Sequence, residues 1–206
     1  MTLHMKPLTT PLMRFATLAL CTLQLAACSK TVHWEEEVPL NTGETIWVKR
    51  TVEYSLKGAG GNPFDIGYRQ DKTETLTFQW GGKNYVYKGD AALMLLAISP
   101  QRQPVLVAPA ADKGWDLNHH YYCTTPHYVQ FVPDATGREW TWPPKIEPWL
   151  YGIPHNLMRQ RSKPGEMKMR YTAEQRNAQD EIGSQQGPSR AKIDPNHVED
   201  GCIRKN

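Results

Sequence analysis

A long run of alternating apolar and polar residues most strongly limits what this chain can fold into. Between residues 46 and 56, apolar residues alternate with polar ones: Ile46, Val48, Val52, Tyr54 and Leu56 are apolar, and Lys49, Thr51, Glu53 and Ser55 are polar. A period of two is typical of a β-strand with one buried face, because successive side chains of a strand point to opposite faces of the sheet. The run therefore predicts a half-buried hairpin.

The segment before this run continues the pattern. Glu35 and Glu37 take one face, and the apolar residues take the even positions of the other: Trp34, Val38 and Leu40. A turn signal, Asn-Thr-Gly-Glu at 41–44, separates the two runs. Pro39 cannot donate a hydrogen bond to a neighbouring strand, so we expect this first strand at an edge of its sheet.

Further runs predict more strands. Residues 76–80 and 85–87 flank Gly81-Gly82, a two-residue link in which both positions accept a positive φ, as tight hairpins require. Later strands are expected at 93–98, 105–108, 121–123, 128–132 and 139–142. Short strands at this spacing predict a mainly β fold, either an antiparallel sandwich or a partly open barrel.

The N-terminus carries the features of an export signal. Lys6 and Arg14 precede a mostly apolar run from Phe15 to Ala27, and no acidic residue occurs before it. The run is too short to span a membrane as a mature helix, and Ala26-Ala27 before Cys28 suit cleavage of a secretory signal. An ordinary signal peptide cleaved nearby, or a cytosolic protein with an apolar N-terminus, is the alternative.

Leu25-Ala26-Ala27-Cys28 also resembles the lipobox of bacterial lipoproteins. That resemblance implies thioether lipidation of Cys28, removal of residues 1–27 and acylation of the new amine. Ser29 follows, where lipoproteins retained in the inner membrane of enteric bacteria commonly have Asp, so the resemblance favours the periplasm-facing side of the outer membrane. No later apolar stretch approaches the roughly 18 residues of a membrane span, so the lipid is the expected anchor.

The mature chain is long enough for one domain and nearly neutral. Removing 27 of 206 residues leaves 179, and without Lys6 and Arg14 its 22 Lys and Arg nearly balance 21 Asp and Glu. A nucleic-acid surface needs basic residues gathered on one face, whereas the charge blocks here are short and mixed. We therefore expect no nucleic-acid partner.

After Pro143-Pro144 the chain becomes more polar and rich in proline. A short helix is expected after Thr172, whose hydroxyl suits an N-cap, and the final residues are polar enough to lie extended over the surface. Four regions follow: a lipoprotein signal peptide (1–27), a lipidated tether (28–33), a β-rich domain (34–158) and a polar C-terminal extension (159–206).

The cysteines fit an oxidising compartment. Cys21 leaves with the signal and Cys28 carries the lipid, so Cys123 and Cys202 are left. A disulfide between these two is the natural pairing outside the cytoplasm. It would close a loop of roughly 80 residues, worth on the order of 4.5 kcal/mol in the chain-entropy model. Two free thiols too far apart to bridge are the alternative.

One segment concentrates residue types that bind metals. His119, His120, Cys123 and His127 are ligands that zinc or copper accept. However, their separations do not place all of them on one face of a strand, and Pro126 interrupts the run. The cluster also competes with the disulfide for Cys123. We therefore expect no cofactor, and a metal-binding protein or enzyme with its site here is the alternative function.

An aromatic and proline-rich stretch contains Trp140, Trp142 and Trp149. The first two occupy alternate positions of an expected strand and could form a platform for a glycan strand or a proline-rich peptide. More often such tryptophans close a β core, because they bury large areas. We expect the core role here.

No common catalytic motif is present. The chain lacks a phosphate-binding loop, a Gly-x-Ser-x-Gly elbow and a His-Glu-x-x-His zinc helix. This disfavours an enzyme, although an active site assembled from distant residues leaves no such motif.

Three short elements resemble a set of uncharacterised proteobacterial lipoproteins. They are Trp-x-Glu-x-Val at 34–38, Gly-x-x-Ile-x-Val-x-Arg at 43–50 and Pro-x-Asn-Leu at 154–157. The resemblance implies a lipid-anchored envelope protein and no catalytic residue. We expect a non-enzymatic binding or structural module that faces the periplasm, with another outer-membrane protein or peptidoglycan as its partner.

Overall fold

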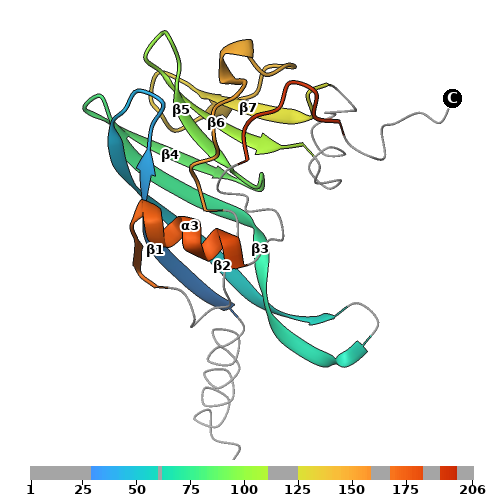
Figure 1. Ribbon diagram of the computed structural model, residues 1–206. Coiled ribbons are helices and arrows are strands. Elements are labelled where there is room, and N and C mark those ends of the chain that lie inside the picture. Colours follow the sequence, from blue (N-terminus) through green and yellow to red (C-terminus); the bar gives the residue numbers. More distant parts are fainter. Residues whose placement is uncertain (1–28, 60–61, 111–124, 159–167, 183–190, 199–206) are drawn as a thin grey trace, which may run out of the picture.

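The computed structural model describes residues 29–59, 62–110, 125–158, 168–182 and 191–198 (Figure 1). Most of the described chain forms two sheets, A and B, which confirms the predicted mainly β, sandwich-like fold. Sheet A contains, in spatial order, β4 (Lys83–Gly89), β3 (Asn62–Trp80), β2 (Thr45–Ala59), β1 (Ser29–Pro39) and β9 (Arg170–Tyr171). Sheet B contains β5 (Leu95–Ile98), β6 (Pro104–Pro109), β7 (Tyr128–Pro133) and β8 (Trp140–Thr141).

Strands β1 to β4 follow the alternation in the sequence. Each strand is antiparallel to the next, and the even positions of β1 and β2 from Trp34 to Tyr54 face inward, with Ile46 half-buried and the others buried. Gly81 and Gly82 have φ values of 56° and 76°, which confirms the two-residue hairpin between β3 and β4.

Strand β1 differs from expectation in where it begins and in which strand lies beside it. The strand begins at Ser29, so residues 29–33, which we expected as a tether, pair with β2 from the Ser29–Ser55 position onwards. The prediction that β1 lies at an edge was wrong, because β9 pairs with it in parallel at Glu35 and Glu36. A segment of the C-terminal extension therefore completes this side of sheet A.

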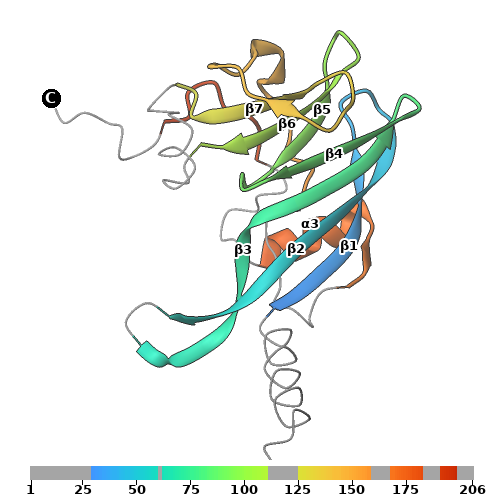
Figure 2. The same cartoon turned by 180° about the vertical axis from the view of Figure 1, so that it is seen from behind.

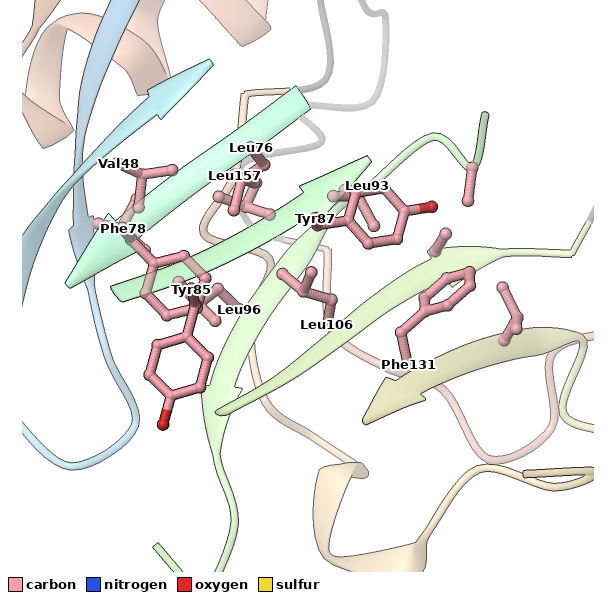
Figure 3. Close-up of a cluster of buried hydrophobic side chains, with 14 of the residues drawn as sticks. Val48, Leu76, Phe78, Tyr85, Tyr87, Leu93, Leu96, Leu106, Phe131 and Leu157 are labelled. Atoms are coloured by element: carbon pink, nitrogen blue, oxygen red, sulfur yellow. The ribbon is translucent and has the colours of Figure 1, made fainter. Parts of the chain in front are cut away.

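The main core lies between the two sheets. Val48, Leu76 and Phe78 from sheet A face Leu106 and Phe131 from sheet B (Figure 3). Sheet B is also covered on its outer face by three later residues: Ile146, Leu150 and Ile193. This second cover explains why β5 and β6 are continuous apolar runs, as strands buried on both faces usually are.

The helix predicted in the C-terminal extension is α3 (Ala173–Ile182), which lies beside β1 (Figure 1). Thr172 caps it as expected. The backbone N–H of Gln175 donates to Thr172 Oγ1, and the N–H of Thr172 donates to Gln175 Oε1, both at 3.3 Å. Arg176 then ties the helix to the sheet, since its Nη1 donates to the carbonyl oxygens of Glu37 and Asn156.

Strands β2 and β3 continue past the start of β1 as a two-stranded ribbon. The ladder between β1 and β2 ends at Ser55, whereas β2 runs on to Ala59 and pairs with β3 down to Asn62. Both views show this ribbon extending away from the body of the molecule (Figures 1 and 2). The end of sheet A at which β1 begins is therefore also the end that carries the ribbon.

Candidate functional site

Three charged side chains lie on the inner face of sheet A. Glu36, Arg50 and Glu74 belong to β1, β2 and β3, and their exposed fractions are 0%, 0% and 2%. Arg50 Nη1 donates to Glu36 Oε1 at 3.0 Å, and Nη2 donates to the two carboxylate oxygens of Glu74 at 2.7 and 3.0 Å. We call these three residues the buried ion cluster.

The buried ion cluster also holds a distant segment against the sheet. Arg50 Nη1 donates to the carbonyl oxygen of Met158 at 2.7 Å, and the N–H of Met158 donates to Glu36 Oε2 at 2.8 Å. Burial by itself lowers the pKa of Arg50, but the charges of Glu74 and Glu36 outweigh it and raise the pKa. Arg50 therefore stays charged, and the contacts of the cluster point to a role in folding.

The sequence contains a signal for this cluster that the predicted strand pattern did not use. Positions 36, 50 and 74 are even, as are the buried apolar residues around them: Trp34, Val38, Val48, Val52 and Leu76. A charged residue on the buried face of a strand needs a partner of opposite charge, because an unpaired buried charge is costly. Two acidic residues and one basic residue on the buried faces of three strands therefore predict a buried ion pair.

Two asparagine amides join sheet B to the end of β1. Asn156 accepts from the N–H of Leu96 at 2.8 Å and donates to its carbonyl oxygen at 2.7 Å, while also donating to Pro39 O at 2.9 Å. Asn41 accepts from the N–H of Ile98 at 2.7 Å and donates to its carbonyl oxygen at 2.9 Å. Each amide thus pairs with β5 as a strand residue would.

Most of the residues predicted for lipidation, the disulfide and metal binding lie outside the described residues: Cys28, His119, His120, Cys123 and Cys202. His127 is described and fully buried. Its backbone N–H donates to His197 O at 2.9 Å, and the two imidazole rings lie 6.5 Å apart. Within the described ranges, no three His, Cys, Asp or Glu side chains are placed to hold a metal ion.

Of the three tryptophans that could have formed a platform, and for which we expected a core role, Trp140 and Trp142 lie together and Trp149 lies elsewhere. Trp140 and Trp142 line one pocket of about 240 Å³, whereas Trp149 packs against the apolar cluster on the outer face of sheet B. Trp140 is half-buried, and its ring contacts Tyr87 edge-on at 5.9 Å. Trp142 is 42% exposed. Trp140 thus belongs partly to the core, while the indole of Trp142 is open to solvent.

A larger depression lies where the β3–β4, β5–β6 and β7–β8 turns meet. Two pockets lie there, of about 380 and 640 Å³, and both are lined by Lys83 and Ala135. The core-facing Trp80 and Tyr85 line the first, and Thr77 and Val86, on the other face of the β3–β4 pair, line the second. Arg102 also lines the first pocket, and Arg138 lines the second. We call this depression the turn groove.

Strand β4 fixes the position of the β7–β8 turn at the groove. The N–H of Val86 donates to Gly137 O at 2.9 Å, and the carbonyl oxygen of Val86 accepts from Trp140 Nε1 at 2.8 Å. Gly137 has a φ of 73°, and a Cβ there would lie 2.8 Å from Cδ1 of Tyr85. Glycine is therefore needed at this contact for both its backbone conformation and its size.

The three cations of the turn groove are exposed: Lys83, Arg102 and Arg138. In the described part of the chain, none of their side chains has a carboxylate within salt-bridge distance. The guanidinium carbon of Arg102 lies 5.4 Å from the centre of the Trp80 ring. Arg102 also has a φ of 59°, a left-handed conformation that is uncommon for a residue with a side chain.

The acid at the groove is already engaged in its own turn. Thr136 Oγ1 lies within 2.9 Å of both carboxylate oxygens of Asp134, and the N–H groups of Arg138 and Glu139 donate to Asp134 Oδ1 at 3.2 Å. The hydrogen bond from Thr136 is the main reason why the pKa of Asp134 falls to about 2. Asp134 thus stays ionised, with its hydrogen-bonding capacity directed at the turn.

Comparisons of the chain with family models, with curated proteins and with solved structures found no match. Among the described residues, no helix combines the length and the apolar character that crossing a membrane requires. Any functional assignment therefore depends on the sequence motifs and on the geometry given above.

Proposed function

We propose that this chain is a lipid-anchored protein of the bacterial cell envelope, attached through Cys28 to the periplasm-facing side of the outer membrane. Its sandwich acts as a binding or structural module without catalytic activity. The observation that carries the proposal is the direct succession of lipobox and strand. Ser29, the residue after Cys28, already pairs with Ser55 in sheet A. A lipid on Cys28 would thus hold one defined end of the sheet at the membrane surface.

This attachment gives the molecule a direction. Strand β1 takes ten residue steps from Ser29 to Pro39, which is about 33 Å at 3.3 Å per residue. Trp80 ends β3 two positions beyond the Val48–Phe78 pair, so the turn groove lies near the Pro39 end. The anchored protein would direct the β2–β3 ribbon toward the membrane and the turn groove toward the periplasm.

The strength of the anchor follows from the lipids that a lipobox implies. A buried methylene contributes about 0.8 kcal/mol, and a single acyl chain binds only reversibly. The three chains of a mature lipoprotein would make the attachment effectively permanent. The protein therefore needs no membrane-spanning segment to stay in place.

The buried ion cluster supports the non-catalytic half of the proposal. Each of its carboxylates binds Arg50, and Glu36 also accepts from the backbone of Met158. The buried charges of Glu36, Arg50 and Glu74 thus bind one another and the backbone of Met158. A stoichiometric metal ion in freshly purified protein would contradict the proposal and favour the site around residues 119–127.

We propose in addition that Cys123 and Cys202 form a disulfide. Two described residues close to them in the sequence are hydrogen-bonded, since the N–H of His127 donates to His197 O at 2.9 Å. Cys123 is four residues from His127, and Cys202 is five from His197, so chain spans of at most about 14 and 18 Å allow the two thiols to meet. Non-reducing peptide mapping should show the two peptides joined, whereas full alkylation of both thiols in unreduced protein would refute the bridge.

Metabolic labelling with a palmitate analogue tests the anchor. The wild-type protein and a Cys21→Ala variant should both be labelled, while Cys28→Ala should not be. Globomycin, which blocks lipoprotein signal cleavage, should leave a precursor that retains residues 1–27. Labelling that survives in Cys28→Ala would refute the assignment.

A further inference from the structure

We propose that the turn groove binds an acidic saccharide, a sugar that carries carboxylate or phosphate groups. The choice of saccharide sources rests on the proposed envelope location. The geometry of the groove does not depend on the lipid. The groove combines three features that such a ligand needs: cations, an aromatic wall and a suitable volume.

The cations come first. Lys83, Arg102 and Arg138 are exposed around the groove and, in the described part of the chain, have no carboxylate partner. Charge-assisted hydrogen bonds to carboxylate or phosphate are stronger than neutral ones, and the planar guanidinium of arginine matches the geometry of both anions. The groove thus offers donors to an anion without first breaking an internal ion pair.

The nearby acids do not cancel this charge. Among the described residues, Asp134 is the one acid that lines the two pockets, and its carboxylate accepts from Thr136 and from two backbone N–H groups. Glu44 lies next to Trp80 and accepts from Trp80 Nε1 at 3.1 Å. Three cations against one acid in the pocket lining leave the groove positive, which favours an anionic ligand.

The aromatic wall accounts for a sugar rather than a bare anion. Trp80 lines the first pocket and is half-buried, so part of its ring can pack against the C–H face of a sugar, whereas Tyr85 behind it is buried. Both rings are held in place. Trp80 Nε1 donates a hydrogen bond to Glu44, and Tyr85 stacks on Phe78 with ring centres 5.1 Å apart. Figure 3 shows the hydroxyl of Tyr85 directed away from the labelled apolar cluster.

The left-handed backbone of Arg102 places a cation over this wall. Its N–H donates to Ser99 O at 2.8 Å, which closes the β5–β6 turn, and its guanidinium lies over the Trp80 ring. Glycine or asparagine adopts this conformation more readily than arginine. Uncommon backbone conformations of this kind cluster at ligand-binding sites. The first pocket, of about 380 Å³, lies within the usual size range of small-molecule sites.

Co-sedimentation of the full-length lipoprotein in detergent tests the proposal with three defined probes. Peptidoglycan sacculi present carboxylates, lipopolysaccharide coupled to beads presents phosphates, and chitin is a neutral glycan. We expect the protein to bind sacculi or lipopolysaccharide at least about tenfold more tightly than chitin, and to bind less tightly as salt is added. Sacculi alone would identify a carboxylated glycan, and lipopolysaccharide alone a phosphorylated one.

Matched variants assign the binding to the groove. Lys83→Gln with Arg102→Gln should weaken it by about tenfold or more, because two charge-assisted contacts are lost. Lys49→Gln with Lys168→Gln removes the same charge from exposed positions elsewhere and should leave binding unchanged. Equal binding by wild type and the groove variant would overturn the proposal, as would wild-type protein that prefers neither acidic probe to chitin.

The same samples separate this proposal from the proposed anchor. Protein that binds an acidic probe but takes up no palmitate analogue would refute the lipid anchor and support the groove. Protein that is labelled but binds neither acidic probe would support the anchor and refute the groove.

Discussion

Among the arginines that lie over tryptophan rings in the described residues, Arg50 and Arg102 have opposite surroundings. Arg50 is fully buried, 5.2 Å from the ring centre of Trp34, and binds two carboxylates and a backbone oxygen. Arg102 is exposed at the turn groove, 5.4 Å from the ring centre of Trp80, and has no carboxylate partner among the described residues.

The difference shows that an arginine over a tryptophan ring can serve either stability or binding. At Arg50, ion pairs and hydrogen bonds are made within the protein, so the cation contributes to the stability of the folded chain. At Arg102, the charged donors are not matched by an internal acid, so they are available to a ligand. Stability and binding should therefore respond oppositely to changes at the two sites.

The largest effect is expected at the buried site. Arg50→Met leaves Glu36 and Glu74 without a counter-charge and should lower the free energy of unfolding by about 3–5 kcal/mol, measured by urea denaturation. Arg102→Met should change it by no more than about 0.5 kcal/mol, as is usual for an exposed side chain. Similar losses at both sites would contradict the comparison.

A triple variant sharpens this test. Combining Arg50→Met with Glu36→Gln and Glu74→Met removes every charge of the buried ion cluster, while Gln at 36 still offers an oxygen to the N–H of Met158. Unfolding should require more urea than for Arg50→Met alone, because apolar replacement of a buried ion cluster avoids an unpaired charge. A triple variant that is less stable than the single one would show that packing dominates.

An intermediate effect is expected at the amides that join the sheets. Asn156→Ala removes partners from both backbone groups of Leu96 and should lower the free energy of unfolding by about 2–4 kcal/mol. Asn41→Ala removes a similar pair of bonds at Ile98, nearer the surface, and should cost about 1 kcal/mol. Thermal unfolding of the two variants gives the comparison, and a larger loss for Asn41→Ala would contradict it.

The smallest effect concerns Asp134 and depends on pH. Folding lowers its pKa from 3.8 to about 2, so its stabilising contribution is present above about pH 4 and is lost as the pH falls through 2. The difference in Tm between wild type and Asp134→Ala should therefore be greatest above pH 4 and shrink toward pH 2. A difference that stays constant from pH 6 to pH 2 would show that the charge of Asp134 is not involved.

The sheet that contains the buried site was largely predictable from the sequence. The same alternation that predicts β1 and β2 also places Glu36 and Arg50 on the buried face, although the strands were predicted from their apolar residues. The Gly81-Gly82 hairpin and the Thr172 cap depend on local geometry, which a few residues determine. Local and periodic signals were therefore reliable.

The turn groove was not predictable in the same way. Trp80, Arg102 and Asp134 belong to three different turns, which meet because of how the two sheets pack. That packing depends on single contacts, such as the N–H of Val86 donating to Gly137 O, which leave no period or motif in the sequence. The addition of β9 to β1 is likewise a contact between distant segments.

The central claim is that the lipid holds the β1 end of the sandwich at the membrane, with the turn groove pointing away. Full-length protein in vesicles, with a fluorescent amino acid in place of either Ser55 or Gln101, tests this directly when nitroxide-labelled lipids are added. Ser55 is opposite Ser29, and Gln101 lies in the β5–β6 turn beside the groove. Strong quenching at 55 and little at 101 is the predicted result. Equal quenching, or stronger quenching at 101, would contradict the account.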